Sequence, residues 1–215
     1  MSSMQADRPS EAVSVAKRYQ RIERPISGAV ALVVAAVAAV GMLSLPLVSG
    51  LLVAAVVLFA VKAPLFKTGG TARLATDAPP EAVRADFASA TPPVLAFQWG
   101  VADDVRSTAD GAMYDLSYLF GLRSVTMGLE TRSNAEDADY RLVVTAGSDS
   151  WGTYDVTITA SDSDETVVDV EWVSNRRFGL NRLPQWLIAE RYRADAFAAQ
   201  GYTLVDRDTA LSVVG

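Results

Sequence analysis

The chain has 215 residues, no cysteine, no histidine and a formal net charge of −6 at pH 7. The lack of cysteine and histidine excludes disulfides, thiolate nucleophiles, the usual zinc ligands and histidine-based proton transfer. The length suits a membrane segment plus one domain, because a single hydrophobic core typically uses ~100–150 residues.

Charge is distributed unevenly along the chain. Residues 1–67 carry a balance of +4, whereas residues 68–215 carry −10. A basic stub beside an apolar segment, followed by an acidic body, is typical of a membrane-anchored protein. The acidic body argues against nucleic acid as the main partner.

The choice of charged residues is also biased, with 17 Asp to 8 Glu and 16 Arg to 3 Lys. Short, strongly hydrated carboxylates and a large net charge keep a surface solvated at high salt. The bias predicts a salt-loving host. The alternative is GC-rich codon usage, which favours Arg over Lys without any salt adaptation.

Residues 1–24 form a basic tail that we expect on the cytoplasmic side. Ser10 is placed as an N-cap, and Val13, Ala16, Tyr19 and Ile22 follow at a spacing of three, which is a weak amphipathic helical pattern. Such a helix would lie on the membrane surface. A disordered tail is the open alternative.

The segment from Pro25 to Val61 has 37 residues without a charge. That is nearly twice the ~20 residues that cross a bilayer core. A single helix of ordinary tilt is therefore excluded, and the break belongs at Pro46, which removes a backbone donor and disfavours helix at the preceding residue. We expect a transmembrane hairpin over 25–66, with helices near 26–45 and 47–65.

Orientation follows from the basic residues that flank both ends of this hairpin, whereas its connection is uncharged. The positive-inside rule then places both termini and the soluble domain in the cytoplasm of a multi-pass membrane protein. The lipid bilayer is the first partner expected, with a protein partner at the membrane as a further one.

Residues 67–92 are rich in Thr, Ala, Pro and Gly, which predicts a linker with a short helix over 81–89. The folded domain is expected over 93–215. Residues 94–99 fit either a buried strand or the start of a helix running to Val105.

Period-two patterns dominate the rest of the domain and predict strands separated by Gly, Asn, Asp and Ser turns. The expected strands are 113–120, 123–131, 140–145, 154–160 and 166–173. A helix over about 183–200 follows, with Asn181 as its N-cap and Gly201 at its end, and then a last strand over 202–213. The fold class is α+β: an antiparallel sheet packed by one long C-terminal helix.

The candidate binding residues gather around this helix. Basic side chains of the otherwise acidic domain are concentrated at Arg176, Arg177 and Arg182, and Arg193 extends this group. Arginine offers a planar fork for phosphate or carboxylate groups, whereas the alternative is pairing with neighbouring Asp and Glu. Trp186 belongs to the same set as a pocket-lining residue, although aromatic residues at this spacing are more often core.

Glu190 breaks the pattern of the helix. A spacing of 100° per residue places it in the middle of an apolar stripe made by Leu183, Trp186, Leu187, Ala194, Phe197 and Ala198. We therefore expect its carboxylate to face the sheet and to pair with Arg193, Arg123 or Arg141. Two acidic turns, 136–139 and 161–165, lack the ligand spacing of a calcium loop and are interpreted as solvated hairpin turns.

Three stretches of the sequence resemble uncharacterised membrane-anchored proteins of salt-loving archaea. They are residues 170–180, Leu183-Pro184-Gln185-Trp186 and Ala198-Ala199-Gln200-Gly201-Tyr202. The resemblance covers most of the soluble domain and implies no known activity.

No catalytic residue, cofactor or metal site is predicted. The sequence favours a membrane-anchored, non-enzymatic binding or interaction module. Two alternatives stay open. One is a sensor domain for a small ligand or a lipid, with a pocket under the long helix. The other is an enzyme limited to Asp, Glu, Ser, Tyr and Arg chemistry, which requires a cleft holding two carboxylates with separated pKa values.

Overall fold

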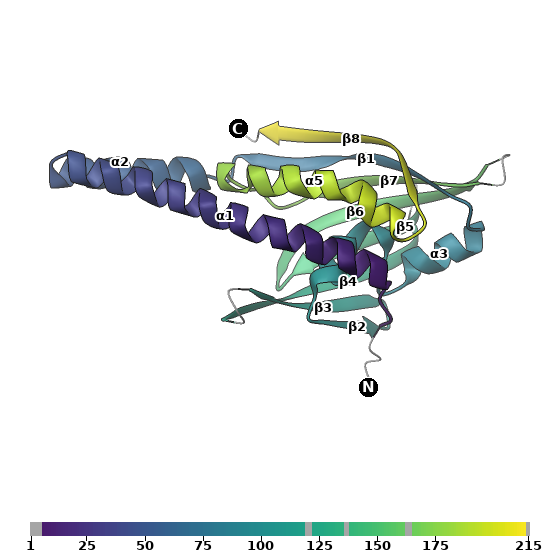
Figure 1. Ribbon diagram of the computed structural model, residues 1–215. Coiled ribbons are helices and arrows are strands. Elements are labelled where there is room, and N and C mark those ends of the chain that lie inside the picture. The colour runs from purple at the N-terminus through teal and green to yellow at the C-terminus, as the bar shows by residue number, and fades with distance from the viewer. Residues whose placement is uncertain (1–5, 119–121, 136–137, 162–164, 214–215) are drawn as a thin grey trace.

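The computed structural model describes residues 6–118, 122–135, 138–161 and 165–213. It consists of a long pair of N-terminal helices joined to a domain with one curved antiparallel sheet (Figure 1).

The N-terminal helix α1 spans Ser10–Ser44, and α2 spans Leu47–Lys62. The expected break is confirmed, because Leu45 is extended and Pro46 precedes the first residue of α2. The two helices pack closely where their small residues meet: a Cβ atom on Gly50 would lie 2.8 Å from Met42 Cα. Within the described residues, α1 alone is long and apolar enough to cross a membrane, whereas α2 has 16 residues.

The helix expected within residues 1–24 is confirmed over residues 10–24, which are not a disordered tail. They continue α1 without a break, and the segment lies against the domain instead of lying apart from it. Ala12 and Ala16 are fully buried, and Ala16 meets Gly100 so closely that no side chain fits there. Small residues on both surfaces thus let the N-terminal half of α1 pack tightly on the domain.

The linker expected over 67–92 is wrong. Strand β1, Phe66–Thr76, lies inside the sheet between β7 and β8, followed by helix α3, Pro80–Ala88, close to the short helix predicted. The Thr- and Gly-rich composition that suggested a linker has a packing role instead. Gly70 has φ 155°, and a Cβ atom there would lie 2.1 Å from Asp208 O.

The sheet has the strand order β2-β3-β4-β5-β6-β7-β1-β8. The predicted antiparallel meander is confirmed by the consecutive strands β3 to β7, and Phe120, the predicted end of its first strand, lies outside the described residues. The meander begins one strand earlier than expected. The strands are β2 Asp104–Thr108, β3 Gly111–Tyr118, β4 Arg123–Ala135, β5 Ala138–Ala146, β6 Asp149–Ala160, β7 Thr166–Ser174 and β8 Thr203–Val213.

The open choice at residues 94–99 is resolved as helical. A short 3-10 turn, Pro93–Leu95, leads into α4, Ala96–Val101. The C-terminal helix α5, Leu183–Ala198, begins after a 3-10 turn, Leu180–Arg182, and a left-handed Gly201 follows its end.

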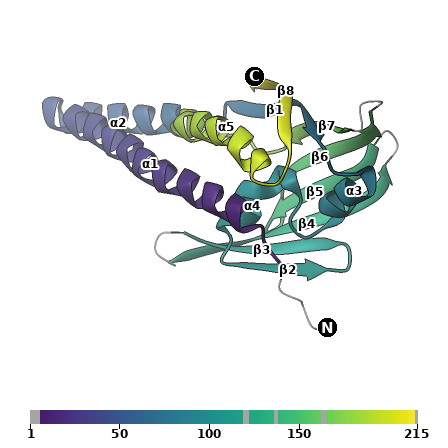
Figure 2. The same cartoon turned by 45° about the vertical axis from the view of Figure 1, so that its right-hand side comes forward.

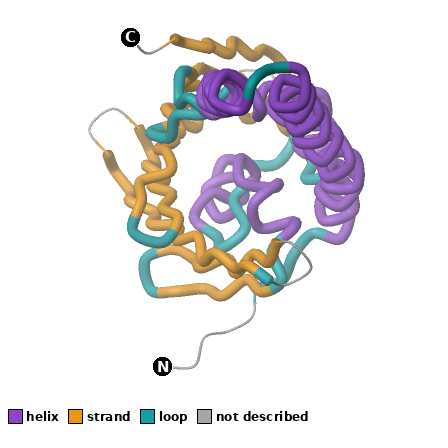
Figure 3. Tube along the Cα trace, turned by 90° about the vertical axis from the view of Figure 1, so that its left-hand side faces the viewer, coloured by secondary structure: helices purple, strands orange, loops and turns teal. Residues whose placement is uncertain are grey.

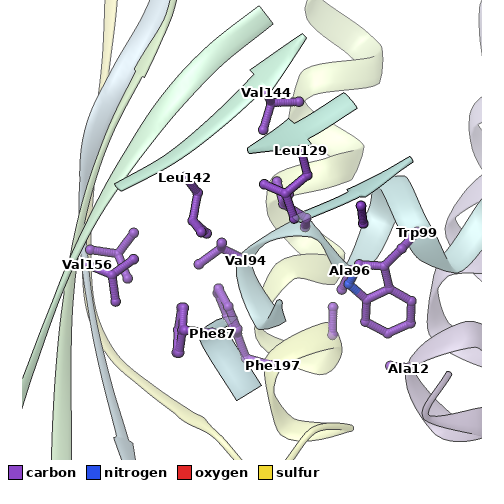
Figure 4. Packing of buried hydrophobic residues seen from close by; sticks show 14 of the residues in the cluster. Ala12, Phe87, Val94, Ala96, Trp99, Leu129, Leu142, Val144, Val156 and Phe197 are labelled. Carbon is purple, nitrogen blue, oxygen red and sulfur yellow. The ribbon is translucent and has the colours of Figure 1, made fainter. Parts of the chain in front are cut away.

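The sheet curls around α3 and α4, and α1 and α5 lie along its open side (Figures 1, 2 and 3). The core lies inside this curl. Phe87 of α3 and Phe197 of α5 lie there with strand residues such as Val156 and Leu142, and Trp99 of α4 lies toward Ala12 of α1 in the same cluster (Figure 4).

Strand alternation separates this apolar interior from an outer face rich in ion pairs. Val168, Val170 and Trp172 of β7 point inward as predicted. The residue between the first two, Asp169, pairs outside with Arg73 at 2.8 Å. Exposed acidic groups therefore cover the convex face and stay away from the interior.

Candidate ligand-binding site beneath the C-terminal helix

A cavity of about 250 Å³ lies between α5 and the inner face of the sheet. Its walls come mainly from β6, β7, β1 and β8 on one side and from α5 on the other. Tyr19 of α1 and Gln98 of α4 also contribute to the lining. An engineered cavity of about 150 Å³ holds a benzene molecule, so this space suits a somewhat larger ligand.

Large apolar side chains make up much of the wall. Trp172 comes from β7, whereas Trp186 and Phe197 come from α5. Val94 and Val170 extend the apolar surface toward the core. Such walls favour an apolar body in the ligand, and a few polar groups then fix its orientation.

An ion triad occupies the polar part of the cavity. Glu190 accepts two hydrogen bonds from Arg207, at 2.7 Å from Nε and 3.1 Å from Nη2, and a third from Arg193 Nη2 at 3.3 Å. The exposed side-chain fractions are 22% for Glu190, 21% for Arg193 and 13% for Arg207. One carboxylate is thus shared by two half-buried guanidinium groups, so the triad carries a net positive charge.

Burial and the neighbouring Arg193 cation lower the pKa of Arg207 from its ordinary value, although Glu190 opposes this. The guanidinium of Arg207 also lies 4.1 Å from the centre of the Trp172 ring, a cation–π contact that partly replaces lost hydration. Arg193 lies over Phe97 at 5.7 Å. The aromatic walls therefore help to hold these cations away from water.

Two polar atoms of residues that line the cavity are shielded from solvent and have no hydrogen-bond partner among the described residues. They are Arg193 Nε and Gln98 Oε1. Buried polar atoms are almost always paired, so these two unpaired atoms are an unusual feature of residues that line the cavity.

The loop between β7 and α5 also lines the cavity. Arg176, Phe178 and Arg182 line it from this loop, and Arg176 lies 4.6 Å from the centre of the Trp151 ring. The same loop meets the end of α2, because a Cβ atom on Gly179 would lie 2.5 Å from Val61 O. The cavity is thus next to the junction between the domain and the N-terminal helices.

Five of the six residues singled out in the sequence line this one cavity: Arg176, Arg182, Trp186, Glu190 and Arg193. The sixth, Arg177, is exposed and lies outside the lining. Of the four tryptophans, Trp99 is fully buried core, whereas Trp151, Trp172 and Trp186 face the cavity.

The predicted stripe on α5 is only partly right. Trp186 and Phe197 do face inward, but Leu187 is 60% exposed, and Ala194 and Ala198 are exposed as well. The inward face is rotated toward Ala189 and Arg193, because α5 packs against α1 as well as against the sheet. Tyr192 contacts Tyr19 of α1 on that second side.

The prediction that Glu190 pairs with Arg193 is confirmed. The prediction of a strand arginine, Arg123 or Arg141, as its partner is wrong. Arg141 pairs with Asp155 on the outer face at 2.6 Å. Arg123 makes no contact with Glu190 among the described ion pairs. The residue that sequence reasoning missed is Arg207, although the pattern Asp206-Arg207-Asp208 places one cation opposite two acids on a strand.

The acidic turns fall largely outside the described residues, at 136–137 and 162–164. Asp139 is described, and its Oδ2 atom accepts a hydrogen bond from the backbone of Ile158. No cluster of three or more His, Cys, Asp or Glu side chains that could hold a metal ion is found in the described part of the chain. Along the described cavity wall, Glu190 is the one carboxylate, so the wall lacks the carboxylate pair that the enzyme alternative requires.

No family model matches the chain. No curated protein matches it either. Among solved structures, a conserved protein from Geobacillus kaustophilus is similar over 61% of this chain and 91% of its own, with 14% identity and a TM-score of 0.42.

Proposed function

We propose that the chain is a membrane-anchored ligand-binding domain, in which the cavity beneath α5 receives a small molecule. The observation that carries the proposal is the 250 Å³ cavity itself, which has aromatic walls and a half-buried ion triad where a tightly packed core would leave no space. The proposal takes up the sensor alternative of the sequence analysis in place of the interaction module that the sequence favoured.

The anchor in this proposal is a two-helix transmembrane hairpin built from α1 and α2. Two facts support it: the 37 uncharged residues from Pro25 to Val61 and the outward exposure of large apolar side chains such as Leu43 and Phe59. The basic residues on both flanks support two passes with both termini and the domain in the cytoplasm.

The site would then lie close to the cytoplasmic surface of the bilayer. The loop that contains Arg176 and Arg182 packs beside the end of α2, and Lys62 and Lys67 mark that end as the membrane boundary. Tyr19 brings α1 to the same cavity as part of its lining, and its ring packs 4.8 Å from that of Phe97 in α4. One continuous helix thus connects the proposed membrane span with the cavity wall, as a sensor requires.

A cavity-filling substitution tests the proposal. Ala189→Trp inserts an indole into the cavity wall, whereas Ala194→Trp adds the same group to an exposed position of α5. Each variant and the parent are purified from native membranes, and their bound small molecules are extracted and identified by mass spectrometry. We expect one compound enriched with the parent and with Ala194→Trp and depleted with Ala189→Trp.

The proposal fails if all three proteins carry the same compounds in the same amounts. Circular dichroism spectra that match the parent show that the cavity-filled variant is folded, so that a loss of ligand is not a loss of structure.

A further inference from the structure

The charge of the cavity wall is opposite to that of the domain. Four arginines, Arg176, Arg182, Arg193 and Arg207, line the cavity with one described carboxylate, Glu190. The domain as a whole has a balance of −10 over residues 68–215. Cations gathered in a partly enclosed space attract an anion more strongly than the same charges on an open surface.

The outer-face acids do not neutralise this charge. On β8, Arg207 and Thr209 line the cavity, whereas Asp206 and Asp208 between and beside them belong to the opposite face. On β7, Trp172 lines the cavity and Glu171 is exposed on the other side. The sheet therefore separates the acidic surface from the arginines inside.

Within the triad, Arg193 uses fewer of its N–H donors on Glu190 than Arg207 does. Arg207 makes the bidentate contact with Glu190, whereas Arg193 makes a single long contact at 3.3 Å. Its Nε atom is buried and has no hydrogen-bond partner in the part of the chain that the structure describes. Arg193 lines the cavity and keeps 21% of its side chain exposed, so the rest of its guanidinium can donate to an incoming carboxylate or phosphate.

The size and the walls of the cavity limit the rest of the ligand. A space of about 250 Å³ lined by Trp172, Trp186 and Phe197 fits one aromatic ring or a short alkyl chain. A longer chain would have to leave through the open side.

We infer that the cavity binds a compact organic anion: a carboxylate or phosphate group that contacts Arg193, attached to an apolar body held by the tryptophans and Phe197. The inference rests on the proposed function and names its ligand class. Two sources supply this chemistry, namely a soluble organic acid and an anionic lipid headgroup from the adjacent bilayer.

Three probes with the same apolar body and different charge test the inference. Isothermal titration calorimetry is run with 4-phenylbutyrate, 4-phenylbutan-1-ol and 4-phenylbutylamine on the full chain in nanodiscs of zwitterionic lipid, with empty nanodiscs as the blank. We expect the carboxylate to bind at least tenfold more tightly than the alcohol, and the amine not to bind.

Arg193→Gln should then weaken phenylbutyrate at least tenfold and leave the alcohol unchanged, and Arg193→Lys should keep part of the affinity. Arg191→Gln removes an exposed arginine from the same helix and should change neither probe. In nanodiscs with added anionic lipid, competition that weakens phenylbutyrate for the parent but not for Arg193→Gln identifies the lipid headgroup as the source. Equal affinity in both lipids identifies a soluble acid.

Equal binding of the acid and the alcohol, unchanged in Arg193→Gln, would overturn the inference and leave the proposed function intact. If none of the three probes binds to the folded parent, both the inference and the proposed function are contradicted.

Discussion

The ion triad gives a direct prediction for stability. Glu190→Gln keeps the shape of the side chain but leaves Arg193 and Arg207 without their shared carboxylate. Removing one partner of a buried ion pair costs about 3–5 kcal/mol, because the remaining charge stays desolvated. The three side chains keep 13–22% of their exposure, so we place the loss at the lower end of that range, at about 3 kcal/mol.

Each kcal/mol shifts the melting temperature of a domain of this size by about 2–4 °C, so we expect a decrease of about 6–12 °C. The assay is thermal unfolding of the full chain, followed by near-ultraviolet circular dichroism of the tryptophans. Glu130→Gln is the matched control, since it removes an exposed pair with Arg132 on the outer face and should leave the melting temperature nearly unchanged.

A double-mutant cycle isolates the pair. The double variant Glu190→Gln with Arg207→Gln should lose less stability than the two single variants added together, because the stranded cation is gone. If Glu190→Gln melts within error of the parent, the triad does not hold a desolvated charge and the electrostatic argument for the cavity is refuted.

Three further predictions concern topology, salt and pH. A cysteine placed at Ser44 should react with an impermeant thiol reagent on intact cells, whereas one at Ser107 should not, and the reverse pattern would show that the orientation is wrong. The domain should lose structure when salt is lowered stepwise, because its acidic surface is then less screened; an unchanged melting temperature and circular dichroism spectrum would favour codon usage over salt adaptation. Burial and the hydrogen bond to Asp86 raise the pKa of Tyr202, so its contribution to stability is complete below about pH 10 and is lost as pH rises toward its folded-state pKa. Tyr202→Phe should therefore lose less stability than the parent between pH 9 and about pH 12 in denaturant titrations, and parallel curves would contradict the assignment.

Local chemistry made much of the fold predictable. Pro46 marks the break between α1 and α2, since a proline disfavours helix at the preceding residue. The alternation of Val168, Val170 and Trp172 with charged residues identified β7 and its buried face. Gly201 similarly marked the end of α5.

The predictions that proved wrong concern features that depend on contacts between distant segments of the chain. Gly69 and Gly70 look like linker residues, but they lie in β1 because their lack of side chains allows close approach to β7 and β8. The face of α5 was misplaced because α1 packs on it, which no pattern within α5 reveals. Arg207 joins Glu190 only after β8 pairs with β1, so the Asp206-Arg207-Asp208 pattern indicates the face of Arg207 but not its partner.

The location of a bound ligand tests the central claim most directly. Crystals of the full chain grown with 4-iodophenylbutyrate report the iodine position by anomalous scattering. We expect a peak inside the cavity between Trp172, Trp186 and Phe197, with the carboxylate density beside Arg193. A cavity without iodine in a crystal that holds the probe elsewhere, such as between α1 and α2, would contradict it.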